Sequence, residues 1–436
     1  MLIFAAALGV RLVAAAGLYL AGGAEAFLIE DSGDYLAIAA GAGDQTQFMP
    51  LYPWFLRAHL AVLGPSPVWP ILSQLVLDSA TCVVVARLAG LVDARLALPA
   101  GMLGAINPVQ VVMATLVLTE TLFVFFCALA LWAALKWLRA PEWRCSVAIG
   151  LPLGLAILTR AMLLPWALGL AVVLPVAARV IGPVSRARVG QAVAATVLAL
   201  ALQAPVVLDN HARHGGWGLT AQGGTFALLW VVPLVIEAKD GTPHAEGARR
   251  MQERFAALID APAGPDPYGR SRAMGRAALG VLAELGAVAI AKAYAYGAAI
   301  NLLAPAVILA TPVRELPRTG FYATPGATKL DKVMAFLFDN DNPLYGWILL
   351  AAAALTLAWR ALQALGLWRG VRAGVRGDRF VGAALVLLVF WIGYILAVNG
   401  PLASAKYRAP IEPALMVLAA LAVRPPGARA GTASWS

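Results

Sequence analysis

Long apolar runs separated by short polar segments dominate the chain. Ten of these runs predict helices, and several reach the length of about 18 residues that crosses the hydrocarbon core of a membrane. They lie near residues 3–22, 68–86, 95–107, 120–138, 146–158, 163–178, 190–208, 344–362, 380–397 and 411–424. A further apolar run at 285–310 fits either two interfacial helices or a re-entrant pair. The pattern predicts an all-α polytopic membrane protein of about 10 helices, or up to 12 if that run adds crossings.

The helices divide the chain into three regions. Residues 1–208 form an N-terminal transmembrane core, and its first external loop spans residues 23–67. Residues 209–343 form an external region whose polar stretches are rich in Pro and Gly. Residues 344–436 contain the C-terminal transmembrane helices and a cytoplasmic tail.

Composition supports a membrane protein and excludes a large soluble domain. Of the 436 residues, 61% are hydrophobic and 13% are charged, whereas soluble domains carry about a quarter charged residues. The net charge of +10 would suit nucleic acid, but Lys and Arg lie in short loops between apolar runs rather than on one amphipathic face. The lipid bilayer is therefore the expected partner, and nucleic acid is not.

The distribution of Lys and Arg predicts the orientation. These residues concentrate in four segments and the C-terminal tail, whereas the loops on the other side carry few; the segments are 86–95, 136–144, 178–189 and 360–379. By the positive-inside rule, that side is cytoplasmic. With ten crossings both termini are cytoplasmic, and the loops of the other face are periplasmic. High Ala, Gly and Arg usage suggests a GC-rich bacterial genome, so the expected location is the bacterial cytoplasmic (inner) membrane.

Neither a disulfide nor a metal framework is expected. Cys82, Cys127 and Cys145 form no CxxC pair, and the first two lie in apolar runs as small packing residues. His211 and His214 have an HxxH spacing, but no third strong ligand lies near them, so the interpretation as a surface loop is favoured.

Five acidic residues follow the first apolar run. They are Glu25, Glu30, Asp31, Asp34 and Asp44. One interpretation is a solvated loop. The spacing of the apolar residues that follow also predicts a short amphipathic helix on the membrane surface, which would hold Asp31 and Asp34 near the lipid headgroups. A carboxylate there could accept the proton of an attacking hydroxyl.

A second acidic feature is Thr119-Glu120, at the external start of a predicted helix. Thr119 could be the N-cap, with Glu120 in the first turn favoured by the helix dipole. Alternatively, a buried Glu120 could orient a sugar or a basic partner.

Four cations stand out from the topology. Arg11 lies inside the first apolar run and must face the bundle or extend to the surface. Arg160 is isolated in apolar sequence and could bind a lipid phosphate in bidentate fashion. Lys406 and Arg408 break the positive-inside trend, which suits either stabilisation of a departing phosphate or simple contact with headgroups.

These motifs, taken in order, resemble the GT-C superfamily of membrane glycosyltransferases. The similarity is to the glycosyltransferase family 39 type, the branch of protein O-mannosyltransferases and lipid A aminoarabinose transferases. It is carried by Asp31-Ser-Gly-Asp-Tyr35, Pro50-Leu-Tyr52, Thr119-Glu120, Gly154-Leu-Ala-Ile-Leu-Thr-Arg160 and Tyr407-Arg408-x-Pro410-x-x-Pro413. None of these motifs is specific alone, but their order and shared face make the combination specific.

The resemblance implies a role for each matched residue. Asp31 stands at the position of the family's catalytic carboxylate, and Asp34 is the nearby alternative. The implied donor-phosphate ligands are Arg160, Lys406 and Arg408, and the implied residues that position the sugar or acceptor are Glu120, Tyr35, Tyr52 and Tyr407. Ser32 replaces the family's Glu, and Phe48 or Met49 replaces a Lys. The first departure weakens the case for a metal held by paired acids, so no cofactor is expected to be required.

The sequence thus predicts an inverting glycosyltransferase with an Asp general base. Its donor would be a polyprenyl-phosphate sugar, and its acceptor a hydroxyl of a glycan, lipid or protein on the periplasmic face. Two alternatives remain open. A transporter or flippase of a lipid-linked saccharide would move its substrate even without Asp31. A noncatalytic GT-C-like partner subunit would show no activity in isolation.

Overall fold

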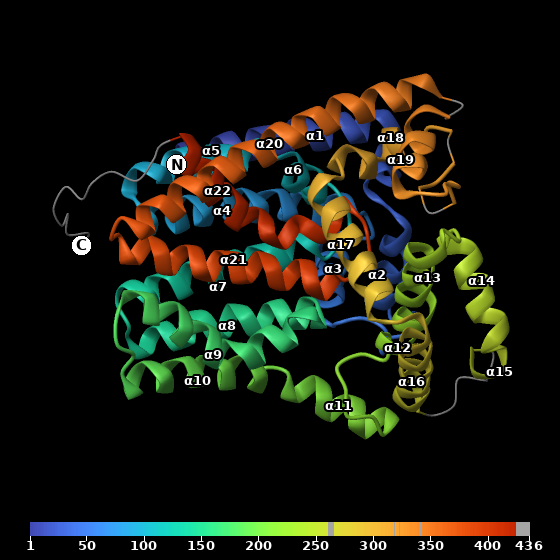
Figure 1. Ribbon diagram of the computed structural model, residues 1–436, viewed down its shortest axis with the longest axis horizontal. Coiled ribbons are helices and arrows are strands. Elements are labelled where there is room, and N and C mark those ends of the chain that lie inside the picture. Colours follow the sequence, from blue (N-terminus) through green and yellow to red (C-terminus); the bar gives the residue numbers. More distant parts are fainter. Residues whose placement is uncertain (260–265, 318, 322, 340–341, 424–436) are drawn as a thin grey trace.

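The computed structural model describes residues 1–259, 266–317, 319–321, 323–339 and 342–423, and this part of the chain contains helices but no strands (Figure 1). Seven of its helical segments are long and apolar enough to cross a membrane, or up to nine if each of two bent pairs is one span. The all-α polytopic architecture is therefore confirmed. The seven are Leu2–Phe27, Val68–Val92, Glu120–Arg139, Ala161–Ile181, Arg186–His214, Leu344–Val375 and Arg379–Asn399.

All ten predicted runs are helical, but the sequence count of ten exceeds the seven to nine spans. Helix α8 (Trp143–Thr159) has 17 residues and α22 (Glu412–Val423) has 12. Because Glu412 to Ala422 are all buried, α22 meets protein rather than lipid, so its apolar sequence reflects the bundle core. The run near 95–107 is α5 (Ala97–Ala105), which is followed after a 54° bend by α6 (Pro108–Ala114). The expected cytoplasmic tail lies outside the described residues.

One set of helices runs side by side as a bundle, and most of the remaining helices, which are mainly shorter, lie at one end of it (Figure 1). The bundle set comprises α1 (Leu2–Gly22), α4 (Val68–Val92), α7 (Glu120–Arg139), α8, α9 (Leu164–Ile181), α10 (Arg186–Ala201), α20 (Pro343–Val375), α21 (Arg379–Asn399) and α22. Small residues allow the closest approaches. A Cβ atom on Gly366 of α20 would lie 1.7 Å from the Leu418 carbonyl oxygen of α22, so any side chain there would force these helices apart.

Arg11 faces the bundle interior. Its guanidinium on α1 is fully buried and forms an ion pair with Asp78 of α4. It also donates hydrogen bonds to the carbonyl oxygens of Ala7, at 3.1 Å, and Ala105, at 3.0 Å. These contacts stabilise the Arg11 guanidinium, whose burial in the bundle would otherwise be costly in free energy. They join α1, α4 and α5 inside the bundle.

This ion pair predicts a stability effect. Replacing Asp78 with Leu leaves Arg11 charged and unpaired in the interior, so we expect a loss of about 3–5 kcal/mol. The double variant Arg11→Leu/Asp78→Leu should recover most of that loss because no buried charge remains. Thermal unfolding of the detergent-purified proteins would test both. A single variant as stable as wild type would contradict this account.

The end with the short helices contains the expected amphipathic helix, α2 (Glu30–Ala40), followed by α3 (Leu51–Leu63). The chain between residues 204 and 338 adds α11 (Ala204–His214), α12 (Gly223–Phe226), α13 (Val232–Asp240), α14 (His244–Arg254), α15 (Ala256–Ile259), α16 (Pro267–Leu285), α17 (Ala287–Leu303), α18 (Thr311–Arg314) and α19 (Lys329–Phe338). Helices α16 and α17 meet at a 105° bend. The bend is at Gly286, which has a positive φ of 90°, a backbone conformation that favours glycine. Of the run 285–310, residues 287–303 thus form one arm of a bent pair.

Candidate functional site

Ser32 fixes the start of α2 and thereby the position of Asp31. The Ser32 hydroxyl accepts a hydrogen bond from the Ile29 N–H, at 2.9 Å, and donates one to the Val117 carbonyl, also at 2.9 Å. Ser32 is fully buried. The residue that departs from the family motif therefore anchors α2 to the segment that precedes Glu120.

Asp31 contacts Lys406, from the opposite end of the sequence. The Lys406 Nζ atom donates to Asp31 Oδ2 at 2.7 Å, and the two residues lie 375 positions apart. The Asp31 side chain is 43% exposed and that of Lys406 is 18% exposed, so this carboxylate remains accessible from outside. Two residues that sequence analysis singled out separately are thus brought together.

Lys406 lies in a short 3-10 helix, η6 (Ala405–Ile411), which α17 holds in place. Asn301 of α17 accepts a hydrogen bond from the Ser404 N–H and donates one to the Leu402 carbonyl, both at 2.8 Å. Burial by itself lowers the pKa of Lys406, but Tyr407, Asp31 and Glu120 raise that pKa above its ordinary value. Lys406 is therefore a cation at neutral pH.

A second ion pair joins Glu120 and Arg160. Glu120 begins α7 and is only 2% exposed, and Arg160 follows the last residue of α8 and donates to the Glu120 carboxylate. The Thr119 hydroxyl donates to the same carboxylate at 3.2 Å rather than capping the helix. The buried Glu120 therefore has a basic partner, Arg160, as one of the two interpretations of the sequence proposes.

Tyr35 lies within electrostatic range of both ion pairs. This residue of α2 is 9% exposed. Burial raises the pKa of its hydroxyl above the ordinary value, Arg160 and Lys406 lower it, and Glu120 and Asp31 raise it. All four charges are thus within electrostatic range of one hydroxyl group. Because its pKa is raised, Tyr35 is protonated at neutral pH and can donate a hydrogen bond into the site.

Tyr52 packs against Tyr35. The two rings meet edge to face at 5.2 Å between centroids. The Tyr52 hydroxyl donates to Gln74 Oε1 at 2.8 Å, and Gln74 Nε2 donates to the Leu116 carbonyl at 2.8 Å. Tyr52 is fully buried, so it orders the site through Tyr35.

Asp34 of α2 and Tyr407 of η6 have different surroundings. Asp34 is exposed, and it forms no hydrogen bond or ion pair within the part of the chain that the structure describes. The Tyr407 ring lies 5.5 Å from the Lys406 ammonium group, a distance at which a cation is attracted to an aromatic face. Tyr407 therefore contributes to holding Lys406.

Arg408 binds a different set of partners from Lys406. Its side chain is 3% exposed, and its Nε donates to Glu412 at 2.9 Å. Its Nη1 donates to three carbonyl oxygens at the end of α17, those of Asn301, Leu302 and Ala304. This guanidinium ties η6 to α17, and its position does not fit the phosphate-binding role that the resemblance implied.

Glu412 is a buried acid that sequence analysis did not assign a role. It is fully buried and accepts hydrogen bonds from Arg408 at 2.9 Å, Asn107 at 2.8 Å and Arg360 at 3.5 Å. The signal in the sequence was a carboxylate that opens an otherwise apolar helix. The distribution of Lys and Arg assigns its partner Arg360, 52 positions away, to a cytoplasmic segment. The sequence therefore does not predict this pair.

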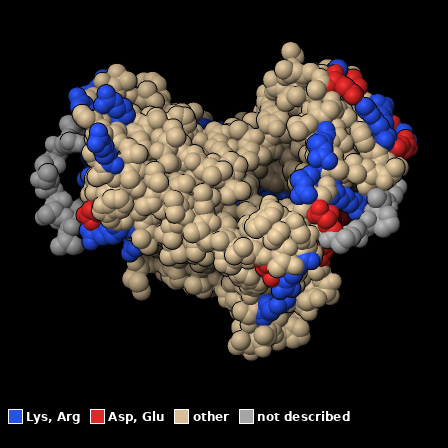
Figure 2. All heavy atoms as spheres, turned by 90° about the horizontal axis from the view of Figure 1, so that it is seen from below, with Lys and Arg blue, Asp and Glu red and all other residues tan. Residues whose placement is uncertain are grey.

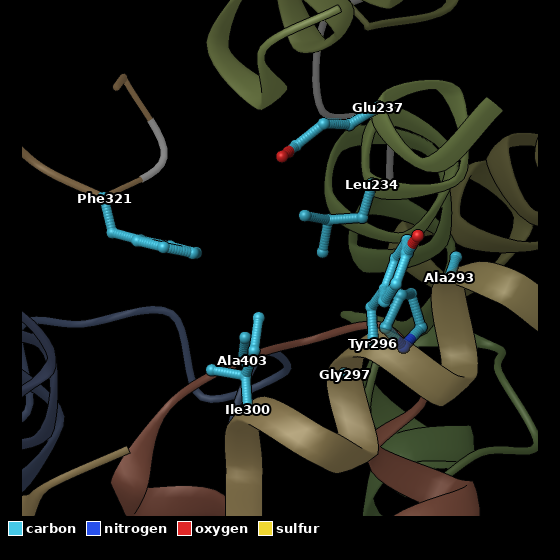
Figure 3. A pocket seen from close by; sticks show the side chains of 9 residues that line it. Leu234, Glu237, Ala293, Tyr296, Gly297, Ile300, Phe321 and Ala403 are labelled. Carbon is cyan, nitrogen blue, oxygen red and sulfur yellow. The ribbon is translucent and has the colours of Figure 1, made fainter. Parts of the chain in front are cut away.

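A small open pocket lies between α13, α17 and the segment that precedes η6. Its enclosed volume is about 20 Å³. It is lined by Leu234 and Glu237 of α13, by Ala293, Tyr296, Gly297 and Ile300 of α17, and by Phe321, Pro401 and Ala403 (Figure 3). Ala403 and Lys406 belong to the same short segment of chain.

No group of three or more His, Cys, Asp or Glu side chains that could hold a metal ion occurs among the described residues. His211 stacks instead on the Trp217 ring at 3.8 Å. That the protein requires no metal remains a prediction from the sequence.

The fold defines a polytopic membrane protein with paired charges at its loop-bearing end. Residues 45–208 match the family model described as dolichyl-phosphate-mannose-protein mannosyltransferase. This match confirms the expected resemblance to GT-C membrane glycosyltransferases. The matched segment includes Tyr52, Glu120 and Arg160, whereas Asp31 and Lys406 lie outside it.

Among solved structures, the chain is similar to the archaeal oligosaccharyltransferase AglB from Archaeoglobus fulgidus in complex with an inhibitory peptide and a dolichol-phosphate. The TM-score is 0.48 and the sequence identity is 13%, over 96% of this chain and 50% of that chain. This chain thus spans about half the length of that protein. No curated protein sequence matches the chain.

Proposed function

We propose that this protein transfers a sugar from a polyprenyl-phosphate donor to a hydroxyl group of an acceptor, with inversion at the anomeric carbon. The observation that carries the proposal is the contact of Asp31 with Lys406 beside the Glu120/Arg160 pair. One accessible carboxylate and two cations around a neutral tyrosine are the groups that such a displacement needs. The matched family model supports a glycosyltransferase, and the proposed donor class is that of the dolichyl-phosphate-mannose-protein mannosyltransferases it describes.

Lys406 and Arg160 are the proposed ligands of the donor phosphate. Each cation now faces a carboxylate. A phosphate that enters between them competes with Asp31 for the Lys406 ammonium group. When Lys406 turns to the phosphate, the Asp31 carboxylate loses its counter-ion and becomes a stronger base. Donor binding would thereby activate the general base.

The bond changes follow from this arrangement. The acceptor oxygen attacks the anomeric carbon and forms the new glycosidic bond, and its proton goes to Asp31. The bond between that carbon and the phosphate oxygen breaks, and its electron pair leaves with the phosphate. Lys406 and Arg160 stabilise the charge that develops there. Because attack and departure occur on opposite sides of the carbon, the configuration inverts.

Asp34 is the weaker candidate for the base because it forms no ion pair among the residues that the structure describes. Arg408 is left out of the phosphate site because its donors already bind Glu412 and the end of α17. Glu120 is proposed to orient Arg160, and Tyr35 to donate a hydrogen bond to the sugar or the acceptor.

The proposed location is a bacterial cytoplasmic membrane with this site on the periplasmic face and both termini in the cytoplasm. Figure 2 shows Lys and Arg side chains at both ends of the molecule, mixed with Asp and Glu on the right and almost free of them on the left. The proposed orientation therefore rests on the loop-by-loop distribution of Lys and Arg in the sequence and the positive-inside rule. The acceptor is proposed to be a glycan, a lipid or a protein.

The test is transfer of label from a panel of radiolabelled polyprenyl-phosphate sugars to a membrane extract by the purified protein in nanodiscs. We expect Lys406→Met and Arg160→Met each to raise the donor KM about 10- to 100-fold, because each removes a charged hydrogen bond to the phosphate. Arg213→Met is the matched control, since Arg213 is an exposed cation of α11 that pairs with the exposed Asp209.

Two results would contradict the proposal. Absence of transfer by wild type, with extract and donors shown to be competent by another transferase, would favour the noncatalytic subunit. Movement of the donor across the bilayer that persists in Asp31→Asn, without transfer, would favour the flippase.

A further inference from the structure

Helix α19 presents a stripe of large apolar side chains that the rest of the described chain leaves exposed. Leu330 is 69% exposed, Met334 48% and Phe338 56%. Because they are spaced four residues apart, they lie on one face of the helix. A single exposed apolar side chain is common on protein surfaces, but a contiguous apolar row indicates a surface that meets a partner or a membrane.

The opposite face of α19 is held against the protein. The Phe336 ring meets the Tyr345 ring of α20 at 5.7 Å and the Phe321 ring at 5.3 Å between centroids, both edge to face. Lys332 Nζ donates to Glu237 Oε1 of α13 at 2.8 Å. Since a helix turns by about 100° per residue, Lys332 and Phe336 lie on the side away from the stripe. The contacts that dock α19 therefore direct the stripe outward.

Two exposed tryptophans mark the position of the membrane along α20. Trp347 is 71% exposed and Trp368 is 55% exposed. The helix between them is about 31 Å long at about 1.5 Å per residue, which matches a hydrocarbon core of about 30 Å. Tryptophan is enriched at both membrane–water interfaces. Arg369 and Arg372 follow Trp368, so Trp347 marks the interface at the loop-bearing end.

Helix α19 lies at the level of that interface. It ends at Phe338, and α20 begins at Pro343, about one turn before Trp347. Figure 1 shows α19 beside this end of α20, and the contact of Phe336 with Tyr345 joins the two helices. The outward face of α20 begins with the exposed Leu344 and Trp347. The stripe of α19 thus continues the lipid-facing surface of α20.

From this arrangement we infer that α19 lies along the surface of the bilayer and inserts Leu330, Met334 and Phe338 between lipid headgroups. The partner of the stripe is the phospholipid surface, because the stripe is continuous with a face that already meets lipid. An amphipathic helix in this position buries its apolar face about 5–10 Å into the boundary between headgroups and acyl chains. Since Lys332 contacts Glu237, α13 is thereby fixed relative to the membrane surface. The inference does not depend on the proposed function.

The test is site-specific fluorescence quenching of the full-length protein in nanodiscs. A bimane label is attached to Leu330→Cys, Met334→Cys or Phe338→Cys. The three native cysteines are all buried, and labelled wild type measures any background from them. Leu355→Cys is the lipid control, since Leu355 is an exposed residue of α20 between the two tryptophans. Glu253→Cys is the aqueous control, since Glu253 is exposed on the charged helix α14.

Each labelled protein is treated with iodide, which stays in water, and with phospholipids that carry a nitroxide at the headgroup or along the acyl chain. We expect the lipid nitroxides to quench all three stripe positions, at similar depths of about 5–10 Å, and iodide to have little effect there. Leu355→Cys should be quenched from deeper in the bilayer, and Glu253→Cys by iodide alone. Only protein that elutes like wild type is measured.

Three results would overturn the inference. Quenching of the stripe by iodide but not by the lipid nitroxides would mean that this face meets water. Protection from both quenchers would mean that protein, such as a second copy of the chain, covers it. A difference in depth of about 12 Å between positions 330 and 338, the rise along that length of helix, would mean that α19 stands upright rather than along the surface.

Discussion

Asp31→Asn is expected to lower the rate of sugar transfer by about 100- to 10,000-fold, the usual contribution of a positioned general base, while the donor still binds. Asn has nearly the shape of Asp, and its amide oxygen can still accept the hydrogen bond that Lys406 now donates to Asp31. The amide cannot take a proton from the acceptor hydroxyl. The loss should therefore appear in kcat, measured at saturating donor with radiolabelled polyprenyl-phosphate sugar, and the donor dissociation constant should change little.

Asp34→Asn is the matched control for this result. It makes the same chemical change one turn further along α2, at an exposed side chain, and activity should stay within about twofold of wild type because surface substitutions have small effects. If Asp34→Asn abolishes transfer and Asp31→Asn does not, Asp34 is the general base and Asp31 is not. If neither variant is impaired, no Asp of this helix is the base.

The helical architecture could be predicted because lipid imposes strict rules on sequence. Arg11 illustrates this: a cation inside an apolar run had to face the bundle or the surface, and it pairs with Asp78 inside. The number of spans was harder to predict, since hydropathy does not distinguish a helix that faces lipid from one enclosed by protein. The short α22, buried along nearly its whole length, is such a case.

The candidate site was predicted as separate motifs, and its assembly was not. Asp31, Glu120, Arg160 and Lys406 come from four segments, and only the fold shows that all four lie within electrostatic range of Tyr35. The interpretation of Ser32 illustrates the limit of motif comparison. As a departure from a family pattern it weakens the case for a metal held by paired acids, whereas in the structure its hydroxyl holds the start of the helix.

Lys406 and Arg408 show why neighbouring cations could not be told apart in the sequence. Both break the positive-inside trend and both follow the family motif. In a 3-10 helix, residues two apart point in different directions, and here one reaches Asp31 while the other reaches Glu412. The accessible cation is suited to a ligand, and the buried one holds the helix that carries it.

Glu412→Leu is expected to produce the largest loss of stability among single changes near the site. The substitution leaves Arg408 and Arg360 without the carboxylate that both now contact, and removes the acceptor for Asn107. Leaving buried cations unpaired costs about 3–5 kcal/mol. Thermal unfolding in detergent, monitored by tryptophan fluorescence, would measure this loss. Glu315→Leu is the control, because Glu315 is 67% exposed and its contact with Arg314 is long, at 3.9 Å.

The conservative variant Glu412→Gln separates stability from positioning. Gln keeps an oxygen for Arg408 but removes the charge that neutralises it, so η6 should loosen without the protein unfolding. Because Lys406 belongs to η6, we expect the donor KM to rise in Glu412→Gln even though Glu412, at 0% exposure, cannot touch the donor. An unchanged donor KM, with the protein folded, would mean that Lys406 is placed by Asp31 and Tyr407 alone. A rise in donor KM that matches Lys406→Met would show that the buried acid acts on the phosphate site through the helix it anchors.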